Sequence, residues 1–176
     1  MIIAIAGLIG SGKDEVAGYI SRKHGYYVID YADILRGICR DEGLEVTRDN
    51  LQNLRVKYGN TFLAEAAVKK AKESGKKNII LTPIRRSEDF TIPEKEFPGI
   101  MMILVEAPER VRFERLKLRK RENYPKDFAE FQRQESREFS IYDFDKTFSY
   151  AKYKIANNGS VEELHSSIDR IMEEMR

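Results

Sequence analysis

Several features that would narrow the class of this protein are scarce in its 176 residues. There is one cysteine, Cys39, so no disulfide can form within the chain, and this usage suits a reducing compartment. Cys39 lies in a helical pattern, which favours a packed thiol over a nucleophile. No apolar run approaches the roughly 18 residues of a membrane span, and the apolar start is too short for a signal peptide. We therefore expect a cytoplasmic protein without a membrane segment.

An excess of charge of one sign is also missing. The chain has 31 lysines and arginines against 29 acidic residues, a net charge of +2. So small an excess does not indicate a nucleic-acid partner. The sequence contains no internal repeat, linker or low-complexity tract. With 41% hydrophobic residues, it is long enough for a full core, and we expect a single domain over residues 1–176, as a monomer or a homodimer.

The most informative stretch lies near the N-terminus, where an apolar run leads into Gly7-Leu8-Ile9-Gly10-Ser11-Gly12-Lys13-Asp14. The spacing G-x-x-x-x-G-K is that of the phosphate-binding P-loop, and the strand–loop–helix context distinguishes it from an ordinary glycine-rich turn. Glycines let the backbone N–H groups point at an anion, and the next helix adds its positive N-terminal end. Lys13 would reach the β- and γ-phosphates. The stretch therefore predicts ATP binding by residues 7–14.

Asp14 departs from the P-loop pattern, which has Ser or Thr at this position to place a hydroxyl on Mg²⁺. A carboxylate here can hold the ion directly or through water, or it can repel the phosphates. The sequence leaves both alternatives open. We take Asp14 as the candidate Mg²⁺ ligand.

The hydrophobic pattern after the P-loop predicts a parallel α/β fold. Strand, P-loop, helix and second strand within about thirty residues form a βαβ unit, which implies parallel strands. We predict a P-loop NTPase fold with three α/β/α layers, a five-stranded parallel sheet and a helical lid. An irregular aromatic segment is expected at residues 140–150. The predicted strands are 2–6, 26–30, 77–82, 100–106 and 152–156, and the predicted helices are 12–23, one from 31, 47–58, 62–74, one from 108 to about 121, 125–139 and one from 160.

Two segments after predicted strands are candidates for binding the second substrate, because ligands of open α/β sheets bind beyond the carboxyl ends of strands. Asp33 and Arg36 follow the second strand and share a helix face, where they either meet a ligand or form a surface ion pair. The two helices after them, up to residue 75, form either a flap over the acceptor or a packed hairpin. Arg85 lies in the loop predicted after the third strand.

A strongly basic helix follows the fourth predicted strand. Arg115 and Arg119 are four residues apart and therefore share a face. Such a run is usually a solvated surface, but guanidinium groups beside a P-loop sheet suit phosphates, which they bind bidentately. RNA binding by this helix is less favoured, because aromatic residues do not alternate with its charges. Arg137 of the next helix points the same way as Gln134.

These segments resemble the nucleoside monophosphate kinases over nearly the whole chain. Residues 32–36, Ala-Asp-Ile-Leu-Arg, are similar to the G-D-x-L-R-like segment of adenylate kinases, and residues 82–85, Thr-Pro-Ile-Arg, to their D-G-x-P-R. Residues 114–119, Glu-Arg-Leu-Lys-Leu-Arg, resemble the lid-helix pattern. The chain is also similar to archaeal adenylate-kinase-related, dephospho-coenzyme-A-kinase-like proteins, in residues 33–36, 47–52, 112–116 and 159–164. A phage deoxynucleotide kinase lineage has a similar G-S-G-K-D loop.

The resemblance implies phosphoryl transfer from ATP, with Mg²⁺, to a nucleoside monophosphate. It implies an acceptor-binding part at about residues 31–75 and a lid at about 115–140. Asn158, in the turn of residues 157–159 after the last strand, either frames the adenine of ATP through backbone atoms or belongs to a bare turn. The implied catalytic residues are Lys13, Arg85, Arg115, Arg119 and Arg137, and the implied acceptor-binding residues are Asp33, Arg36 and Arg85.

One departure from the family concerns the metal. Thr82 and Pro83 replace an Asp-Gly pair whose aspartate helps to hold Mg²⁺, and we hypothesise that Asp14 supplies the missing carboxylate. Two other functions remain open. A dephospho-coenzyme A kinase would use Asp33 as the base for a hydroxyl acceptor. A nucleotide-binding regulator or weak ATPase would have lost kinase turnover with the acidic residue.

Overall fold

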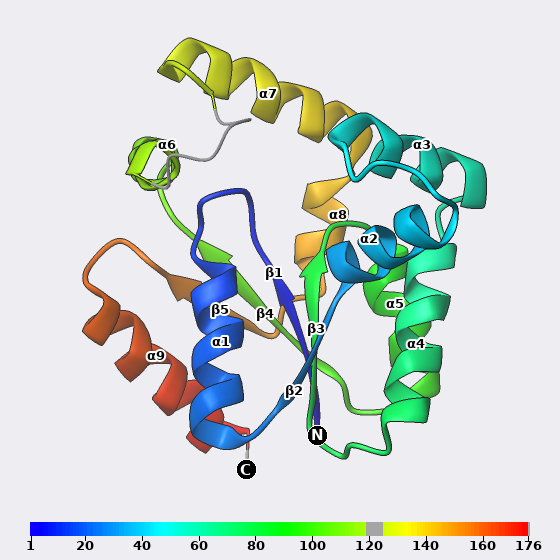
Figure 1. Ribbon diagram of the computed structural model, residues 1–176. Helices are drawn as coiled ribbons and strands as arrows, with labels where there is room; N and C mark the ends of the chain where they lie inside the picture. Colours follow the sequence, from blue (N-terminus) through cyan, green and yellow to red (C-terminus); the bar gives the residue numbers. More distant parts are fainter. Residues whose placement is uncertain (119–124, 176) are drawn as a thin grey trace.

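The computed structural model describes residues 1–118 and 125–175, apart from the side chains of residues 48, 49 and 52. Within these ranges, five strands form one sheet in the order β2-β3-β1-β4-β5, and every neighbouring pair is parallel (Figure 1). The predicted five-stranded parallel sheet is confirmed. The strands are β1 (Ile2–Ala6), β2 (Tyr27–Asp30), β3 (Ile79–Ile84), β4 (Met101–Glu106) and β5 (Tyr153–Ala156).

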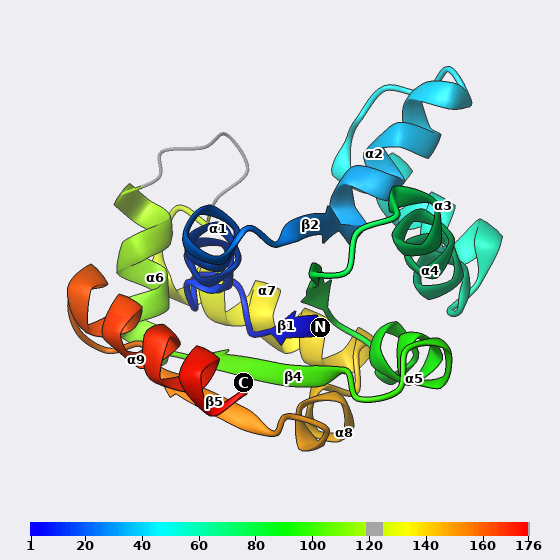
Figure 2. The same cartoon turned by 90° about the horizontal axis from the view of Figure 1, so that it is seen from below.

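Helices cover both faces of the sheet and complete the predicted three layers. Helices α1 (Lys13–His24) and α9 (Val161–Glu174) pack on one face, and α4 (Phe62–Ser74) and α5 (Ser87–Glu96) lie on the other (Figure 2). A capping box begins α9, with Ser160 and Glu163 each accepting the other's backbone N–H group. The other described helices are α2 (Tyr31–Asp41), α3 (Arg48–Tyr58), α6 (Glu109–Leu118), α7 (Phe128–Ile141) and α8 (Phe144–Ser149).

The core follows from the alternation of side chains along the central strand β1. Ile3 and Ile5 pack into the cluster beneath α1 and α9, whereas Ala4 and Ala6 join the cluster on the opposite face. None of the four has any exposed surface. A parallel strand buried on both faces needs such a continuous apolar run. Cys39 is also fully buried, as expected of a packed thiol.

Strand β3 extends two residues farther than the sequence predicts. Pro83 and Ile84 belong to the strand rather than to the following loop, and the Thr82–Pro83 peptide bond is cis. The pairing of β1 with β3 shifts register between Ala4 and Ala6, opposite this segment. Proline has no N–H for the ladder, so an irregular pairing here is expected. Arg85 consequently follows the strand directly.

Two described helices are absent from the sequence prediction. Helix α5 contains Pro93, which interrupts the helical pattern of the sequence. Its start is held instead by the buried carboxylate of Asp89, which accepts the backbone N–H groups of Arg85 and Arg86, each at 3.0 Å. Helix α8 lies in the segment predicted to be irregular, and with six residues it is too short to show a period.

The segment predicted as a lid is described in part. Helix α7 begins at Phe128 rather than at Pro125, because Asp127 caps it by accepting the N–H of Glu130 at 2.7 Å. The end of the basic helix after Leu118, including the predicted catalytic Arg119, lies outside the described residues. In the part of the chain that is described, no helix is both long and apolar enough to cross a bilayer.

Candidate functional site

The P-loop follows β1 at the carboxyl edge of the sheet, and its glycines stand where a side chain would collide. A Cβ on Gly7 would come within 2.5 Å of the carbonyl oxygen of Val105, and one on Gly12 within 2.2 Å of the Asn157 amide nitrogen. Gly10 and Gly12 also have φ values of 78° and 100°, in the left-handed region that favours glycine. The glycine spacing of the sequence therefore matches the geometry of the loop.

Asn157 holds the P-loop from the β5 side. Its amide nitrogen donates to the carbonyl oxygen of Ser11 at 2.8 Å, and the residue is buried. Arg115 of α6 donates to the backbone and side-chain oxygens of Asn157, at 3.0 and 3.2 Å, and to the same Ser11 carbonyl at 3.4 Å. The structure thus brings Arg115 to the P-loop, whereas its catalytic role stays a prediction. Asn158, the residue of this turn predicted to contact ATP, comes directly after Asn157 and is exposed.

Arg112 joins α6, the P-loop and α7, and sequence reasoning missed it. Its guanidinium group donates to the carbonyl oxygens of Ala107 at 3.0 Å and Ile9 at 3.4 Å. It also forms a bidentate ion pair with the carboxylate of Glu135 on α7. The Arg112 side chain is only 5% exposed. In the sequence it is one member of a basic run. A buried arginine needs a charged partner, but nothing in the sequence identifies Glu135 as that partner.

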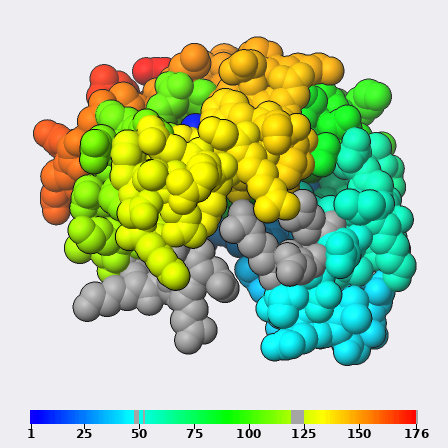
Figure 3. Space-filling view, turned by 90° about the horizontal axis from the view of Figure 1, so that it is seen from above, coloured from blue at the N-terminus to red at the C-terminus, as the bar shows by residue number. Residues whose placement is uncertain are grey.

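Helix α7 lies across the carboxyl edge of the sheet, above the P-loop (Figures 1 and 3). Figure 3 looks down on this edge and shows α7 in yellow and the segment of α2 and α3 in cyan, at the lower right. Ile9 of the P-loop packs against a small apolar cluster that α6 and α7 share. The phosphate loop is therefore in contact with the segment predicted as a lid. The buried members of the cluster are Phe113, Leu116 and Phe131.

Lys13 and Asp14 begin α1, directly after the last P-loop glycine. The Lys13 residue is 8% exposed, and its Nζ lies 3.6 Å from a carboxylate oxygen of Asp14, whose side chain is 64% exposed. A carboxylate in this place is a suitable oxygen ligand for Mg²⁺, which commonly takes one or two carboxylates together with phosphates and water. Among residues 1–118 and 125–175, no group of three or more His, Cys, Asp or Glu side chains gathers as a metal cluster.

Two buried hydroxyl groups fit a nucleotide and its ion at this edge. Ser11 Oγ of the P-loop and Thr82 Oγ1 near the end of β3 have no hydrogen-bond partner among the described residues. Buried hydroxyls are normally hydrogen-bonded, so these two are candidates to contact a ligand. Hydroxyl and carboxylate oxygens are hard ligands of the kind that Mg²⁺ prefers, so these two groups and Asp14 are chemically suited to a magnesium–nucleotide complex.

The residues predicted at the acceptor site do not all come together. Arg36 donates to Asp33 at 2.5 Å and lies 3.8 Å from Asp30, so the ion-pair alternative describes Asp33 and Arg36 in this structure. The Asp30 side chain caps α2 by accepting backbone N–H groups. Burial and the nearby Asp33 raise the pKa of Asp30 above its ordinary value, against these hydrogen bonds and Arg36. Within the described residues, no contact joins Arg36 to Arg85.

Arg85 contacts helix α7 rather than Arg36. Its guanidinium group donates to Glu138 at 3.1 Å, with side-chain exposures of 26% and 16%. Burial works against the charge of Arg85, but the Glu138 carboxylate outweighs it and raises the pKa of Arg85. Tyr142 follows α7, and the Arg85 guanidinium carbon lies 5.6 Å from the centre of its ring. Arg137 is exposed on α7, and no described contact joins its side chain to the P-loop.

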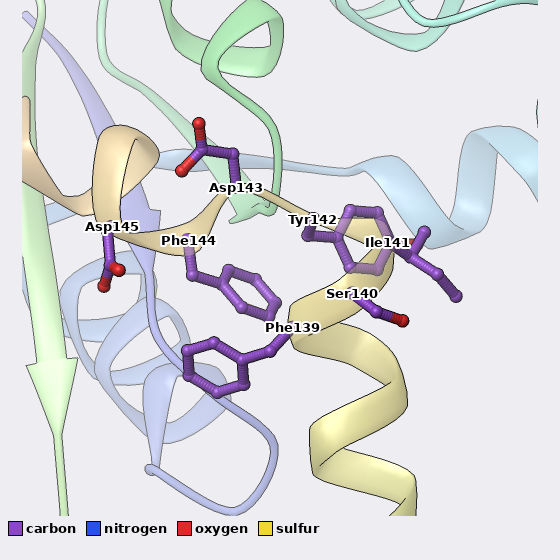
Figure 4. A pocket seen from close by; sticks show the side chains of 7 residues that line it. All are labelled: Phe139, Ser140, Ile141, Tyr142, Asp143, Phe144 and Asp145. Carbon is purple, nitrogen blue, oxygen red and sulfur yellow. The ribbon is translucent and has the colours of Figure 1, made fainter.

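An open pocket of about 330 Å³ lies between the end of α7 and the start of α8 (Figure 4). The rings of Phe139 and Phe144 meet edge to face in its wall, with centres 5.1 Å apart. Tyr142 also lines it and thereby connects the pocket to Arg85. The lining residues are Phe139, Ser140, Ile141, Tyr142, Asp143, Phe144 and Asp145.

The parallel sheet, the P-loop and the helix above it define a P-loop kinase-like protein. A shikimate kinase from Bacteroides thetaiotaomicron superposes with a TM-score of 0.66, covering 99% of this chain and 98% of its own, at 17% identity. A gluconokinase from Sinorhizobium meliloti gives a TM-score of 0.59, covering 98% of this chain and 94% of its own, at 18% identity. At these identities the likeness concerns the fold alone.

Sequence relatives place the chain in a family. Residues 6–131 match the model of the AAA domain. The UPF0200 protein of Pyrobaculum aerophilum is 31% identical over 178 residues, covering 99% of this chain and 98% of its own length. That of Thermococcus kodakarensis is 28% identical over 183 residues, with coverages of 99% and 98%. The chain therefore belongs to the AAA domain family and to the UPF0200 proteins, and the predicted resemblance to archaeal kinase-like proteins is confirmed.

Proposed function

We propose that this protein is an ATP-dependent phosphotransferase that converts ATP and a nucleoside monophosphate to ADP and a nucleoside diphosphate. The observation that supports the proposal is that Arg85 follows β3, the neighbour of the strand that leads into the P-loop. β1 and β3 are neighbours in the sheet, so the P-loop and Arg85 leave the same edge from adjacent strands. A donor triphosphate on one strand end and an acceptor phosphate on the next is the arrangement that direct phosphoryl transfer needs.

On this proposal the P-loop amides of residues 10–12 bind the β-phosphate and Lys13 contacts the β- and γ-oxygens. Asp14 would hold Mg²⁺, which neutralises phosphate charge when bound. Phosphoryl transfer depends mainly on positioning and charge stabilisation, and an acceptor phosphate is already nucleophilic, so no strong base is required. The proposal also treats residues 1–176 as one domain, with residues 31–75 on the acceptor side. Arg115 would act on the transferring group from beside the P-loop, with Arg119 and Arg137 brought in by closure of residues 115–140.

A second candidate is a kinase for a hydroxyl acceptor such as dephospho-coenzyme A. The observation that favours it is Asp33, whose carboxylate lies just beyond the end of β2, with 59% of its side chain exposed. A hydroxyl group must lose its proton during transfer, and a carboxylate within reach is a suitable base. A third candidate, a nucleotide-binding regulator or weak ATPase, is favoured by Thr82 and Pro83 at the place of the family's Asp-Gly pair.

One experiment separates the three candidates. ADP release from Mg-ATP is measured with AMP, CMP, UMP, GMP, their deoxy forms or dephospho-coenzyme A as acceptor. The proposal predicts strong stimulation by at least one monophosphate and loss of that stimulation in Lys13→Ala. Stimulation by dephospho-coenzyme A alone would support the hydroxyl-acceptor kinase. ATP binding with no stimulation by any acceptor would contradict both kinases and support the regulator.

A further inference from the structure

The peptide unit that joins Ile9 to Gly10 in the P-loop is held from behind by α6. Arg112 donates to the carbonyl oxygen of Ile9 at 3.4 Å. In a trans peptide unit the C=O group and the N–H group of the next residue point in opposite directions, so this bond turns the Gly10 N–H away from the Arg112 side chain. The main chain of α6 packs against the same unit, because a Cβ on Gly10 would come within 2.7 Å of the Arg112 carbonyl oxygen.

The amide group that this bond orients is available to a ligand. Gly10 is buried, yet no described residue accepts its N–H, and the Gly12 N–H likewise has no acceptor among the described residues. The peptide unit before Gly12 is held in the same way, by the bond from Asn157 to the Ser11 carbonyl oxygen at 2.8 Å. Buried N–H groups are nearly always hydrogen-bonded, and N–H groups at the start of a helix bind phosphate. The loop therefore presents two oriented donors for a phosphate.

The guanidinium group of Arg112 can stay buried behind the loop only if its charge is balanced. Its side chain is 5% exposed, and Glu135 of α7 supplies the opposite charge through the bidentate ion pair. Nε donates to the Ala107 carbonyl oxygen at 3.0 Å, so the planar group is fixed on several sides. Helix α7 also packs closely on the loop, because the cavity that Ile9 and Glu135 line together measures only about 10 Å³.

We propose that Arg112 is a positioning residue for the nucleotide. It holds the Ile9 carbonyl outward, so that the Gly10 N–H faces the β-phosphate, and Glu135 holds Arg112 in place. Helix α7 thereby contributes to the affinity of the P-loop for ATP through Arg112. This inference rests on the proposed function, because it needs a triphosphate in the P-loop. A purely structural role, in which Arg112 only joins α6 to α7, would lower stability and leave nucleotide affinity unchanged.

The test compares nucleotide affinity with stability in variants of the full chain. Calorimetry measures binding of a non-hydrolysable ATP analogue with Mg²⁺, and urea unfolding confirms that each variant is folded under the same conditions. We expect Arg112→Lys to bind the analogue at least about tenfold more weakly, because lysine keeps the charge but loses the planar set of donors. Glu135→Gln should weaken binding several-fold. Arg133→Lys is the matched control, since Arg133 is exposed on α7.

Two further measurements distinguish positioning from a general loss of stability. If Glu135 acts through Arg112, the double variant Arg112→Lys/Glu135→Gln should bind the analogue no more weakly than Arg112→Lys alone. In proton–nitrogen NMR spectra of isotope-labelled protein, the Gly10 amide signal should shift when the analogue binds, and this shift should be smaller in Arg112→Lys. If Arg112→Lys does not fold, the nearly isosteric Glu135→Gln carries both the affinity and the NMR comparison.

The outcomes separate this inference from the proposed function. Failure of the unaltered protein to bind the analogue would contradict the proposed function itself. Analogue binding with equal affinity in Arg112→Lys and the unaltered protein would overturn only the positioning role, as would an equal shift of the Gly10 signal in both. Additive losses of affinity in the double variant would overturn the part assigned to Glu135, because the two side chains would then act independently.

Discussion

Asp14 is the residue at which this P-loop differs most clearly from the common pattern. Its carboxylate is 64% exposed and lies 3.6 Å from the ammonium group of Lys13, so it is accessible from solvent beside the P-loop lysine. The resemblance to nucleoside monophosphate kinases implies an Asp-Gly pair where this chain has Thr82-Pro83, and with it an aspartate that helps to hold Mg²⁺. A carboxylate supplied by Asp14 would compensate for that loss, and this hypothesis can be tested by restoring the usual residue.

We predict that Asp14→Ser abolishes Mg²⁺-dependent turnover instead of improving it. The serine would restore the common motif but remove the carboxylate available to the ion in this loop. Steady-state ADP formation at increasing Mg²⁺ concentration measures the effect, and Asp41→Ser, at an exposed position in α2, is the control. Equal or higher activity in Asp14→Ser would show that the carboxylate has no role in metal binding.

Asn157 leads to a second prediction at the residue scale. Asn157→Ala removes the bond to the Ser11 carbonyl and one of the oxygens that Arg115 contacts. The P-loop loses its support from the β5 side, and we expect ATP-analogue affinity to fall about tenfold, the effect of one such contact. Asn158→Ala, one residue later and exposed, should bind the analogue normally. Normal analogue affinity in Asn157→Ala would contradict the supporting role of Asn157.

The site residues that could be predicted from the sequence differ from those that could not in how far along the chain their partners lie. Gly7, Gly12 and Lys13 could be predicted because the P-loop is a local motif whose spacing alone indicates its geometry. Arg112 could not, because its partner Glu135 lies 23 residues farther along the chain. A buried arginine and a solvated one look alike in a basic run, and only the fold shows which has a carboxylate beside it.

At the scale of elements, α7 is attached to the P-loop through a buried ion pair. We predict that Glu135→Ala lowers the free energy of unfolding by roughly 3 kcal/mol, because it leaves the buried charge of Arg112 unpaired. Urea unfolding measures the change. Glu114→Ala, an exposed carboxylate on α6, should stay within about 0.5 kcal/mol of the unaltered protein. Equal effects of the two substitutions would mean that the pair does not stabilise the contact between α7 and the P-loop.

On the face of the sheet away from α4 and α5, charged side chains join helices α1 and α9. Asp169 accepts from Lys23 at 2.7 Å and from Tyr19 at 3.0 Å, and these bonds, with that to Lys23 foremost, lower the pKa of Asp169. The pKa of Glu15 is likewise lowered, mainly by its hydrogen bond to His165. A carboxyl whose pKa is lowered by folding stabilises the native state above its unfolded pKa of about 4.

We therefore predict that stability falls as the pH drops below about 4, where these carboxylates become protonated through their lowered pKa values. Asp169→Asn should remove part of this dependence and leave a shallower slope. The measurement is the free energy of unfolding in urea between pH 7 and pH 3. An identical slope in Asp169→Asn would show that the contact between α1 and α9 does not depend on this charge.

Most elements could be predicted from periodicity and caps, and the exceptions have local causes. Helix α5 was missed because Pro93 breaks its pattern, although the buried Asp89 secures its start. Helix α8 is shorter than two helical turns, so its residues show no helical period and the sequence predicts an irregular segment there. The sequence predicts that strand β3 ends at Thr82, because proline normally terminates a strand, whereas the strand continues to Ile84.

At the scale of the whole molecule, strand order determines which segments meet. The order β2-β3-β1-β4-β5 places the P-loop after β1 between the ends of β3 and β4. Segments from distant parts of the sequence therefore converge on one edge, where α7 covers them (Figure 1). The sequence predicts a parallel sheet with a βαβ start, but the neighbours of each strand, and hence the segments that meet at its carboxyl edge, follow only from the assembled sheet.

The central claim is that the γ-phosphoryl group of ATP passes directly to a bound acceptor phosphate. The most direct measurement follows ATP labelled on its γ-phosphate, in the presence of Mg²⁺ and each nucleoside monophosphate in turn, and identifies the labelled product. The account predicts a labelled nucleoside diphosphate that disappears in Lys13→Ala and is strongly reduced in Arg85→Ala. Label released only as inorganic phosphate, in equal amount with and without any acceptor, would contradict it.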